Sequence, residues 1–458
     1  MTSIMHNVGR REFLKRSALL STVPLGGALL AAAAASAQSA NDYKALVCID
    51  LSGGNDQSNT VIPLSTTGYN TYQRARPTLA LRRDRILPLN PTNYSGEEVG
   101  LHPSLGKLKT LIDSGRMAIL ANVGPLAYPT TKEQLQAGSV PLPLQIGSHS
   151  DQMNAWQSGV PDAASETGWM GRIGDLTEGV FNPGSGVSMA MSLSGSNILQ
   201  AGDRTIQYQL STNGAVRVGA LEYLYGDGGA VAARQLMTGE RSHLLEKELT
   251  AIRNRSIRSE EIVRTALVSP AGTLPSDPFP RTRIGQQLKM VARMISVRSA
   301  LSQRRQVFYI NQGNYDHHDN LINTDAAGHA ALLRDAADAI DAFNTAMNAL
   351  GAAQNVTTFT VSEFGRTLQH NGRGSDHGWG GHHFIMGGAV AGNRIYGSFP
   401  TVALGGPEDG GQGQLIPTTS VDQYAATLAN WFGVSGSDMR TVLPNISRFS
   451  NINLGFLS

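Results

Sequence analysis

Short apolar segments, each closed by a group of polar side chains, restrict the fold of this chain more than any other feature. Lys44–Asp50 (KALVCID) is a continuous apolar run that ends in an acid and is followed by the glycine-rich Ser52–Asp56 (SGGND). Such a run is typical of a strand buried on both faces of a parallel sheet, and α/β folds bind ligands at the carboxyl ends of such strands. Gln306–Ile310 and Val356–Val361 are two further runs that precede polar clusters.

The segments between these runs predict helices and further strands. Helical spacing of apolar residues is found at 102–114, 244–304 (with a break at 269–280) and 330–350, and in a final helix capped by Ser420 and ended by Gly433. Met117–Val123 reads as another buried strand, whereas residues 180–225 alternate in polarity and predict antiparallel strands or long surface loops. The order of elements predicts an α/β fold with a mainly parallel central sheet between helices.

The N-terminus carries the signature of an export signal. Arg10-Arg11-Glu12-Phe13-Leu14-Lys15 precedes an alanine-rich apolar run from Ala18 to Ala35, and Ala35-Ser36-Ala37 is the expected cleavage site. The alternative is a membrane anchor, but Pro24, Gly26 and Gly27 interrupt the run. We expect residues 1–37 to be a twin-arginine signal peptide and the mature protein to be periplasmic or extracellular.

Charge and cysteine content exclude some classes of function. Residues 1–37 contain four basic residues and one acid, so their removal changes the formal charge from +2 to −1. No basic excess remains that would favour nucleic acid, and no second apolar run is long enough to span a bilayer. Cys48 is the only cysteine, so an internal disulfide cannot form.

Metal-ligand residue types gather just past the predicted strand ends. Seven of the eleven histidines lie between His317 and His383, and imidazole and carboxylate groups are the ligands of divalent metals. We expect one or two ions held by some subset of Asp50, Asp316, His318, Glu363, Asp376, His377 and His382. Zn would suit the histidines, and Ca, Mg or Mn would suit a set dominated by carboxylates.

Each candidate ligand has a plainer interpretation. Asp50 could accept hydrogen bonds from the glycine-rich loop after it, and Asp56 could be a ligand or simply turn the chain. An extended backbone would place Asp316 and His318 on the same side and His317 on the other, but the same run could be a solvated loop. The loop after Glu363 holds Asp376-His377 and His382-His383, of which His383 is expected behind the ligands or at the surface.

Two residues are candidates for catalysis. Ser148 follows a glycine at the expected start of a helix, where orphan N–H groups would stabilise an oxyanion, so it could be a nucleophile; an ordinary helix-capping serine has the same appearance. Arg366 lies three residues after Glu363, and it could either form a structural ion pair or bind the anionic group of a substrate.

Taken in order, these motifs resemble the DUF1501 family of exported bacterial proteins. The matching segments are Leu51–Asp56, Ser148-His149 leading to Trp156, Tyr315–His318, Ser362–Thr367, Ser375–His382 and Thr419–Tyr424. The family is grouped with the alkaline phosphatase and sulfatase superfamily. The resemblance therefore implies an alkaline phosphatase-like domain over 38–458, with a β-rich and helical insertion around 180–300.

The resemblance also implies roles for single residues. Asp50 matches the acid after the first strand, Ser148 the nucleophile, Asp316 and His318 the middle pair, and Asp376 with His377 the late Asp-His pair. The chain departs from the superfamily because its late Asp-His lies a dozen residues beyond the strand end, which holds Glu363 instead. No Cys-x-Pro-x-Arg segment is present, which disfavours sulfatases of the modified-cysteine type.

Two functions remain open on this basis. The first is an exported metal-dependent hydrolase of phosphate or sulfate esters, acting on a small or polymer-linked anionic ester. The second is a secreted binding or assembly protein that keeps the fold, and perhaps a structural metal, without catalysis.

Overall fold

A ten-stranded mixed sheet lies at the centre of the computed structural model, which describes residues 42–217, 219, 221, 226–323 and 328–458. The export signal expected at 1–37 lies outside the described residues. Strands follow the order β14 (Ile395–Tyr396), β5 (Met117–Gly124), β13 (Gly381–Gly387), β10 (Val356–Val361), β1 (Lys44–Leu51), β9 (Arg305–Gln312), β6 (Ala190–Ser192), β7 (Tyr208–Ser211) and β8 (Gly214–Ala215), and β15 (Thr419–Ser420) pairs with β5.

The centre of the sheet is parallel. β1 pairs in parallel with β10 and β9, and the register places Asp50 beside Val361 on one side and Asn311 on the other. The carboxyl ends of β1, β9 and β10 therefore meet at one edge of the sheet, as the apolar runs predicted. β13 is the exception, because it runs antiparallel to both β10 and β5.

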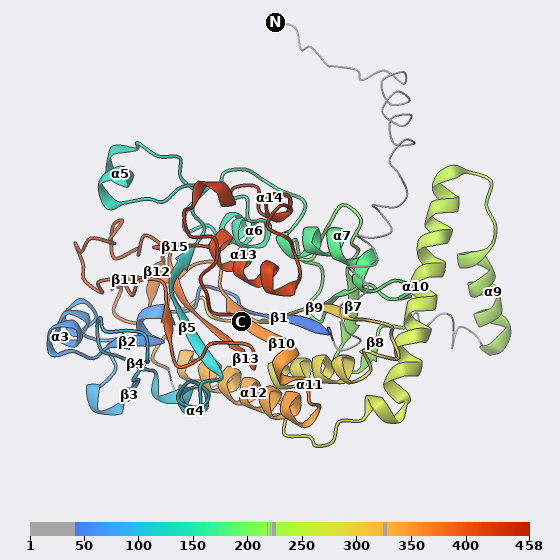
Figure 1. Cartoon of the computed structure of the whole chain (residues 1–458), viewed down its shortest axis with the longest axis horizontal. Coiled ribbons are helices and arrows are strands. Elements are labelled where there is room, and N and C mark those ends of the chain that lie inside the picture. Colours follow the sequence, from blue (N-terminus) through green and yellow to red (C-terminus); the bar gives the residue numbers. More distant parts are fainter. Residues whose placement is uncertain (1–41, 218, 220, 222–225, 324–327) are drawn as a thin grey trace, which may run out of the picture. The chain divides into compact units, whose positions relative to one another are not determined.

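Helices cover both faces of the sheet (Figure 1). On one side lie α4 (Gly106–Asp113), α11 (Arg283–Ser296) and α12 (His329–Ala349), and on the other α6 (His149–Ser158), α7 (Trp169–Phe181) and α13 (Val421–Phe432). The core beneath the second group joins Leu46 and Cys48 of β1 to Trp169 of α7 and Leu428 of α13. An α/β fold with a mainly parallel sheet between helices is confirmed.

Smaller elements surround this centre. Beyond the sheet are a three-stranded sheet of β2 (Val61–Pro63), β4 (Val99–Leu101) and β3 (Leu87–Pro88), a hairpin of β11 (Arg366–His370) and β12 (Ser375–His377), and the helices α3 (Thr66–Ala75), α5 (Lys132–Ala137), α9 (Gly226–Thr238), α10 (Leu244–Val268) and α14 (Met439–Val442). None of the described helices combines the length and apolar character needed to cross a bilayer.

Two local predictions need correction. Within the described part of 180–225, β7 and β8 pair antiparallel as predicted, but β6 pairs in parallel with both β7 and β9, so this segment extends the main sheet. The segment after Glu363 is not one long loop but three strands, of which β13 is fully buried. The apolar residues Phe384, Ile385 and Met386 complete the sheet between β10 and β5, and this long-range pairing overrides the loop-like histidine and glycine composition.

Candidate metal centre

Two buried carboxylates face each other at the edge where β1 and β10 end. Asp50 is completely buried; its Oδ2 accepts hydrogen bonds from Tyr309 Oη at 2.6 Å and Asn311 Nδ2 at 3.0 Å. Glu363 is 3% exposed, and its Oε1 accepts from Gly53 N at 2.8 Å. Burial, reinforced by the charge of Glu363, raises the pKa of Asp50 to about 7.

One oxygen of each carboxylate lacks a hydrogen-bond donor. Asp50 Oδ1 and Glu363 Oε2 are buried and accept no hydrogen bond from the described residues. A buried carboxylate oxygen without a donor is costly, and two such groups close together repel each other, unless a cation compensates them. The pair therefore has the chemistry of a site for a hard or borderline cation.

The glycine-rich loop after β1 lets other segments approach this pair. Gly53 has φ +116°, and a Cβ there would lie 2.4 Å from the backbone N of Asp316. Gly54 has φ +85°, and a Cβ there would lie 2.3 Å from the ring of Phe364. Only glycine adopts these conformations without strain, and any larger residue would collide with these neighbours. The Gly-Gly pair therefore lets the segment after β9 and the end of β10 both pack against the loop after β1.

Asp316 is the shared acceptor of the site. Its Oδ1 lies 2.7 Å from Nη1 of Arg366, 3.1 Å from Nε2 of His318 and 3.2 Å from Nε2 of His377. Burial alone would raise the pKa of Asp316, but the Arg366 guanidinium outweighs it and lowers that pKa below its ordinary value. Asp316 is therefore a carboxylate, with its charge available to cations.

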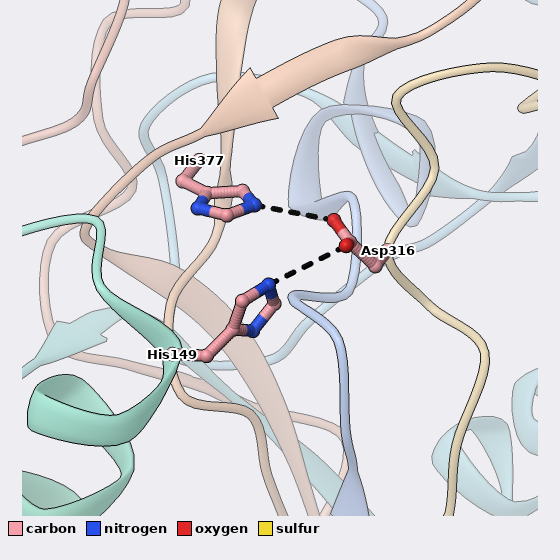
Figure 2. A group of neighbouring side chains, drawn as sticks. All are labelled: His149, Asp316 and His377. Carbon is pink, nitrogen blue, oxygen red and sulfur yellow. Dashed lines mark hydrogen bonds and ion pairs between the residues drawn. The ribbon is translucent and has the colours of Figure 1, made fainter.

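Histidines from α6 and β12 converge on Asp316 (Figure 2). His149 is the first residue of α6 and points its Nε2 at Asp316 Oδ2, 3.4 Å away, while His377 approaches Oδ1 from the end of β12. One possible ligand atom from each of these three residues lies within 4.8 Å of the others. Phe364 supports both imidazoles, with ring centroids 4.5 Å from His377 and 4.9 Å from His149.

His318 adds a third imidazole to the group. Its Nε2 lies 2.8 Å from Nε2 of His377, and its Nδ1 lies 3.1 Å from Oδ1 of the exposed Asp376. Asp376 therefore contacts the site through His318. His317 points away from Asp316, and its ring centroid lies 5.7 Å from that of the buried His329.

Acceptors behind the three histidines orient their rings. Nδ1 of His149 lies 2.8 Å from Glu363 Oε1, and Nδ1 of His377 lies 2.6 Å from the carbonyl oxygen of Gly147. Nδ1 of His318 faces Asp376 in the same way. Carbonyl and ionised carboxylate oxygens only accept, so each Nδ1 donates to the oxygen behind it, and this hydrogen bond holds each ring with its Nε2 toward Asp316.

Electrostatics differ among these histidines. The hydrogen bond to Glu363 raises the pKa of His149, whose side chain is 42% exposed. Burial lowers the pKa of His377, and nearby Arg366 and His149 add to this effect. His377 is thus the more readily available as a neutral ligand.

The two catalytic candidates are engaged with protein groups. Ser148 is the N-cap of α6: its Oγ accepts from Asp151 N and donates to Asp151 Oδ2 at 2.6 Å. Arg366 is fully buried and, besides Asp316, donates to the carbonyl oxygens of Gly53 and Ser375. Its partner is Asp316, not the nearby Glu363.

Two other candidates contact different parts of the protein. His382 lies in β13, where its Nδ1 accepts from Asn122 N at 3.1 Å and its ring stacks on Phe399. Burial lowers the pKa of His382 to about 3. Asp56 forms a fully buried ion pair with Arg76 at 2.6 Å, so its carboxylate is already compensated.

His149 is the ligand candidate that the sequence did not single out. From the sequence, His149 could equally be a group that supports the ligands or a polar residue on the first turn of a helix. The available signal was the order Gly147-Ser148-His149, in which a turn glycine and a capping serine put the histidine at the first position of a helix.

The residues present fit a divalent cation. Three Nε2 atoms directed at one carboxylate match the nitrogen and oxygen donors of zinc sites, and hydrogen-bonded Nδ1 groups behind them are the usual support of metal-binding histidines. The uncompensated oxygens of Asp50 and Glu363 add a neighbouring oxygen-rich position.

A family model described as "Protein of unknown function (DUF1501)" matches residues 43–410. No curated protein matches the sequence.

Several solved structures resemble the fold at low identity. The PsFucS1 sulfatase from Pseudoalteromonas sp. is 10% identical with a TM-score of 0.36, over 95% of this chain and 77% of that one. The lipoteichoic acid synthase LtaP from Listeria monocytogenes is 8% identical with a TM-score of 0.32, over 90% and 79%. The soluble domain of lipooligosaccharide phosphoethanolamine transferase A from Neisseria meningitidis is 11% identical with a TM-score of 0.34, over 92% and 95%. At these TM-scores, the likenesses say nothing about the reaction of this chain.

Proposed function

This chain belongs to the DUF1501 family, and we propose that it is an exported metal-dependent hydrolase of phosphate or sulfate esters. The observation that carries the proposal is the convergence of His149, His318 and His377 on Asp316, with each Nδ1 hydrogen-bonded to an acceptor behind it. Three imidazole Nε2 atoms and a carboxylate in one place are the donor set of a divalent metal site.

We propose Asp316, His318 and His377 as the ligands of one ion, and Asp50, Glu363 and His149 as ligands of the same ion or of a second. A bound divalent ion would polarise the ester and lower the pKa of water. The mixed nitrogen and oxygen donors favour zinc, whereas the Asp50 and Glu363 oxygens alone would favour Mg, Mn or Ca.

The chain's own residues prepare this site for an anionic ester. Arg366 holds Asp316 by an ion pair of 2.7 Å and keeps it ionised. Glu363 holds the His149 ring from behind, and its hydrogen bond raises the pKa of His149. A half-exposed imidazole of this kind is placed to bind an ester oxygen or to donate a proton from Nε2 to a leaving group.

Metal content and turnover test this proposal together. The purified protein would be analysed for bound metals and assayed with a chromogenic phosphomonoester, a phosphodiester and a sulfate ester. We expect His377→Ala to lose metal and activity, and His370→Ala, whose Nδ1 contacts the Thr78 hydroxyl outside the site, to keep both. Absence of any metal after reconstitution with Zn²⁺ or Mn²⁺ would refute the proposal.

A second function is favoured by one observation. The Ser148 hydroxyl is held by Asp151 in the N-cap of α6, so an activated nucleophile is not evident, and the chain could bind a metal and an anionic ligand without catalysis. Tight metal binding with no turnover across the ester panel would support this binding function.

Export is proposed from residues 10–37, which lie outside the described residues. N-terminal sequencing of the protein recovered from the periplasm or the medium would test cleavage after Ala37. Arg10→Lys together with Arg11→Lys should retain the protein in the cytoplasm if the twin-arginine route carries it.

A further inference from the structure

The helical pair α9 and α10 exposes large aliphatic side chains. In the first half of α10, Leu245 is 73% exposed, Leu249 44% and Ile252 47%. By contrast, Val263, Ala266 and Leu267 near its end are buried. α10 is therefore anchored at its C-terminal end, while its N-terminal half presents an apolar surface to solvent.

The three aliphatic side chains form a single stripe. Positions 245, 249 and 252 are separated by four and three residues, the spacing of the contact seam of a coiled coil. α9 packs elsewhere on the helix: its Arg234 lies 3.8 Å from Glu261, and at 3.6 residues per turn Glu261 is about 180° around α10 from Ile252. The stripe is left uncovered by α9.

Charged residues border the stripe in a fixed order. Glu246 and Arg253 lie on one flank, and Glu248 and Arg255 on the other, so that each flank has its acid before its base. Glu248 and Arg255 lie 3.3 Å apart along the same helix, which shows that they share a flank. Glu246 and Arg253 form no ion pair within the described ranges.

We propose that the N-terminal half of α10 is a self-association surface that pairs antiparallel with α10 of a second copy of this chain. A two-fold axis passing between Thr250 and Ala251 brings Leu249 of each copy against Ile252 of the other. The same operation places Glu246 against Arg253 of the second copy, and Glu248 against Arg255. Both flanks are then complementary, as an isologous interface requires.

A second copy suits this surface better than an anionic bilayer does. A membrane-binding helix is expected to carry basic residues on both sides of its apolar face, whereas each flank of this stripe carries one acid and one base, Glu246 with Arg253 and Glu248 with Arg255. The order of acid before base on each flank gives no advantage at a lipid surface, but it favours the antiparallel direction of a helix pair.

Sedimentation velocity of the purified full chain over a range of concentrations tests the surface. We expect a reversible dimer that Leu249→Glu converts to monomer. Val268→Glu is the matched control, because Val268 is 77% exposed at the end of the same helix but off the stripe, and it should leave the dimer intact. Circular dichroism would verify that both variants remain folded.

A charge-reversal cycle tests the partner and its direction. Glu246→Arg and Arg253→Glu should each raise the dimer dissociation constant about tenfold or more, and the double variant should restore it, because the symmetric pairs are re-formed with opposite sign. The proposal would be overturned if the wild-type protein stays monomeric or if the double variant does not restore the dimer. It would also be overturned if the protein does not self-associate but binds anionic vesicles, and Leu249→Glu abolishes that binding.

Discussion

The guanidinium of Arg366 is completely buried 2.7 Å from Asp316 Oδ1, while the Asp316 side chain is 42% exposed. Arg366 thus lies in the protein interior, whereas Asp316 faces the candidate metal ligands His318 and His377. The arrangement makes Arg366 a positioning residue, because it also holds the loop carbonyl of Gly53.

Replacement of Arg366 should therefore affect both stability and metal binding. Arg366→Met removes a buried charge and leaves its acceptors without a donor, so we expect the free energy of unfolding to fall by about 3 kcal/mol. Metal affinity should fall about 10- to 100-fold, as for other supporting contacts behind metal ligands. Chemical denaturation and metal titration would measure the two effects.

Arg373→Met is the matched control. Arg373 also pairs with an aspartate, Asp319, at 2.7 Å, but both side chains are largely exposed, and exposed pairs contribute less than about 1 kcal/mol. Equal effects of the two substitutions would contradict a positioning role for Arg366.

Ser148→Ala separates the two roles considered for Ser148. As an N-cap, Ser148 should contribute about 1 kcal/mol to stability, and its loss should change turnover of any ester substrate by less than about tenfold. Thermal unfolding and initial rates would be compared with those of Ser150→Ala, a neighbouring exposed serine. A loss of turnover of about a thousandfold or more, with metal content unchanged, would instead identify Ser148 as the nucleophile.

The strand ends of the site could be predicted from the sequence because they depend only on residues that are neighbours along the chain. A continuous apolar run closed by Asp50, and another followed by Glu363, predict buried parallel strands whose ends meet. These features need only the run itself and its neighbours along the chain.

The remaining features depend on contacts that sequence spacing does not reveal. Arg366 pairs with Asp316 rather than with Glu363 three residues away, because β11 turns its side chain toward the segment after β9. His382 and His383 belong to β13, whose place between β10 and β5 is set by pairing with strands far away in the sequence. His149 reaches the site only because α6 starts there.

The buried His383 should make the protein sensitive to acid. Burial lowers the pKa of His383 to about 3, and His382 adds to the effect, whereas the unfolded chain has a pKa of about 6.5. The unfolded state therefore binds more protons below pH 6.5, so stability falls as the pH falls from about 6.5 toward 3. His383→Phe should remove about 3 kcal/mol of the loss between pH 7 and pH 4.

Denaturant unfolding at a series of pH values would measure this slope. His370→Phe, at a histidine outside the core, should leave the slope unchanged. If His383→Phe leaves the pH dependence of stability as steep as in the wild type, the folded protein does not lower the pKa of His383 as predicted.

Asp422 should produce the opposite pH dependence. It is buried in the first turn of α13, both of its carboxylate oxygens lack a hydrogen-bond partner among the described residues, and burial raises its pKa to about 7. The folded state then holds a proton that the unfolded chain releases near pH 4, so stability falls as the pH rises from about 4 to about 7. Asp422→Asn should thus be more stable than wild type at pH 8, by about 2 to 4 kcal/mol, with little difference at pH 4. The exposed Asp113→Asn serves as the control, and a pH-independent effect of Asp422→Asn would show that the Asp422 carboxyl is ionised in the folded protein.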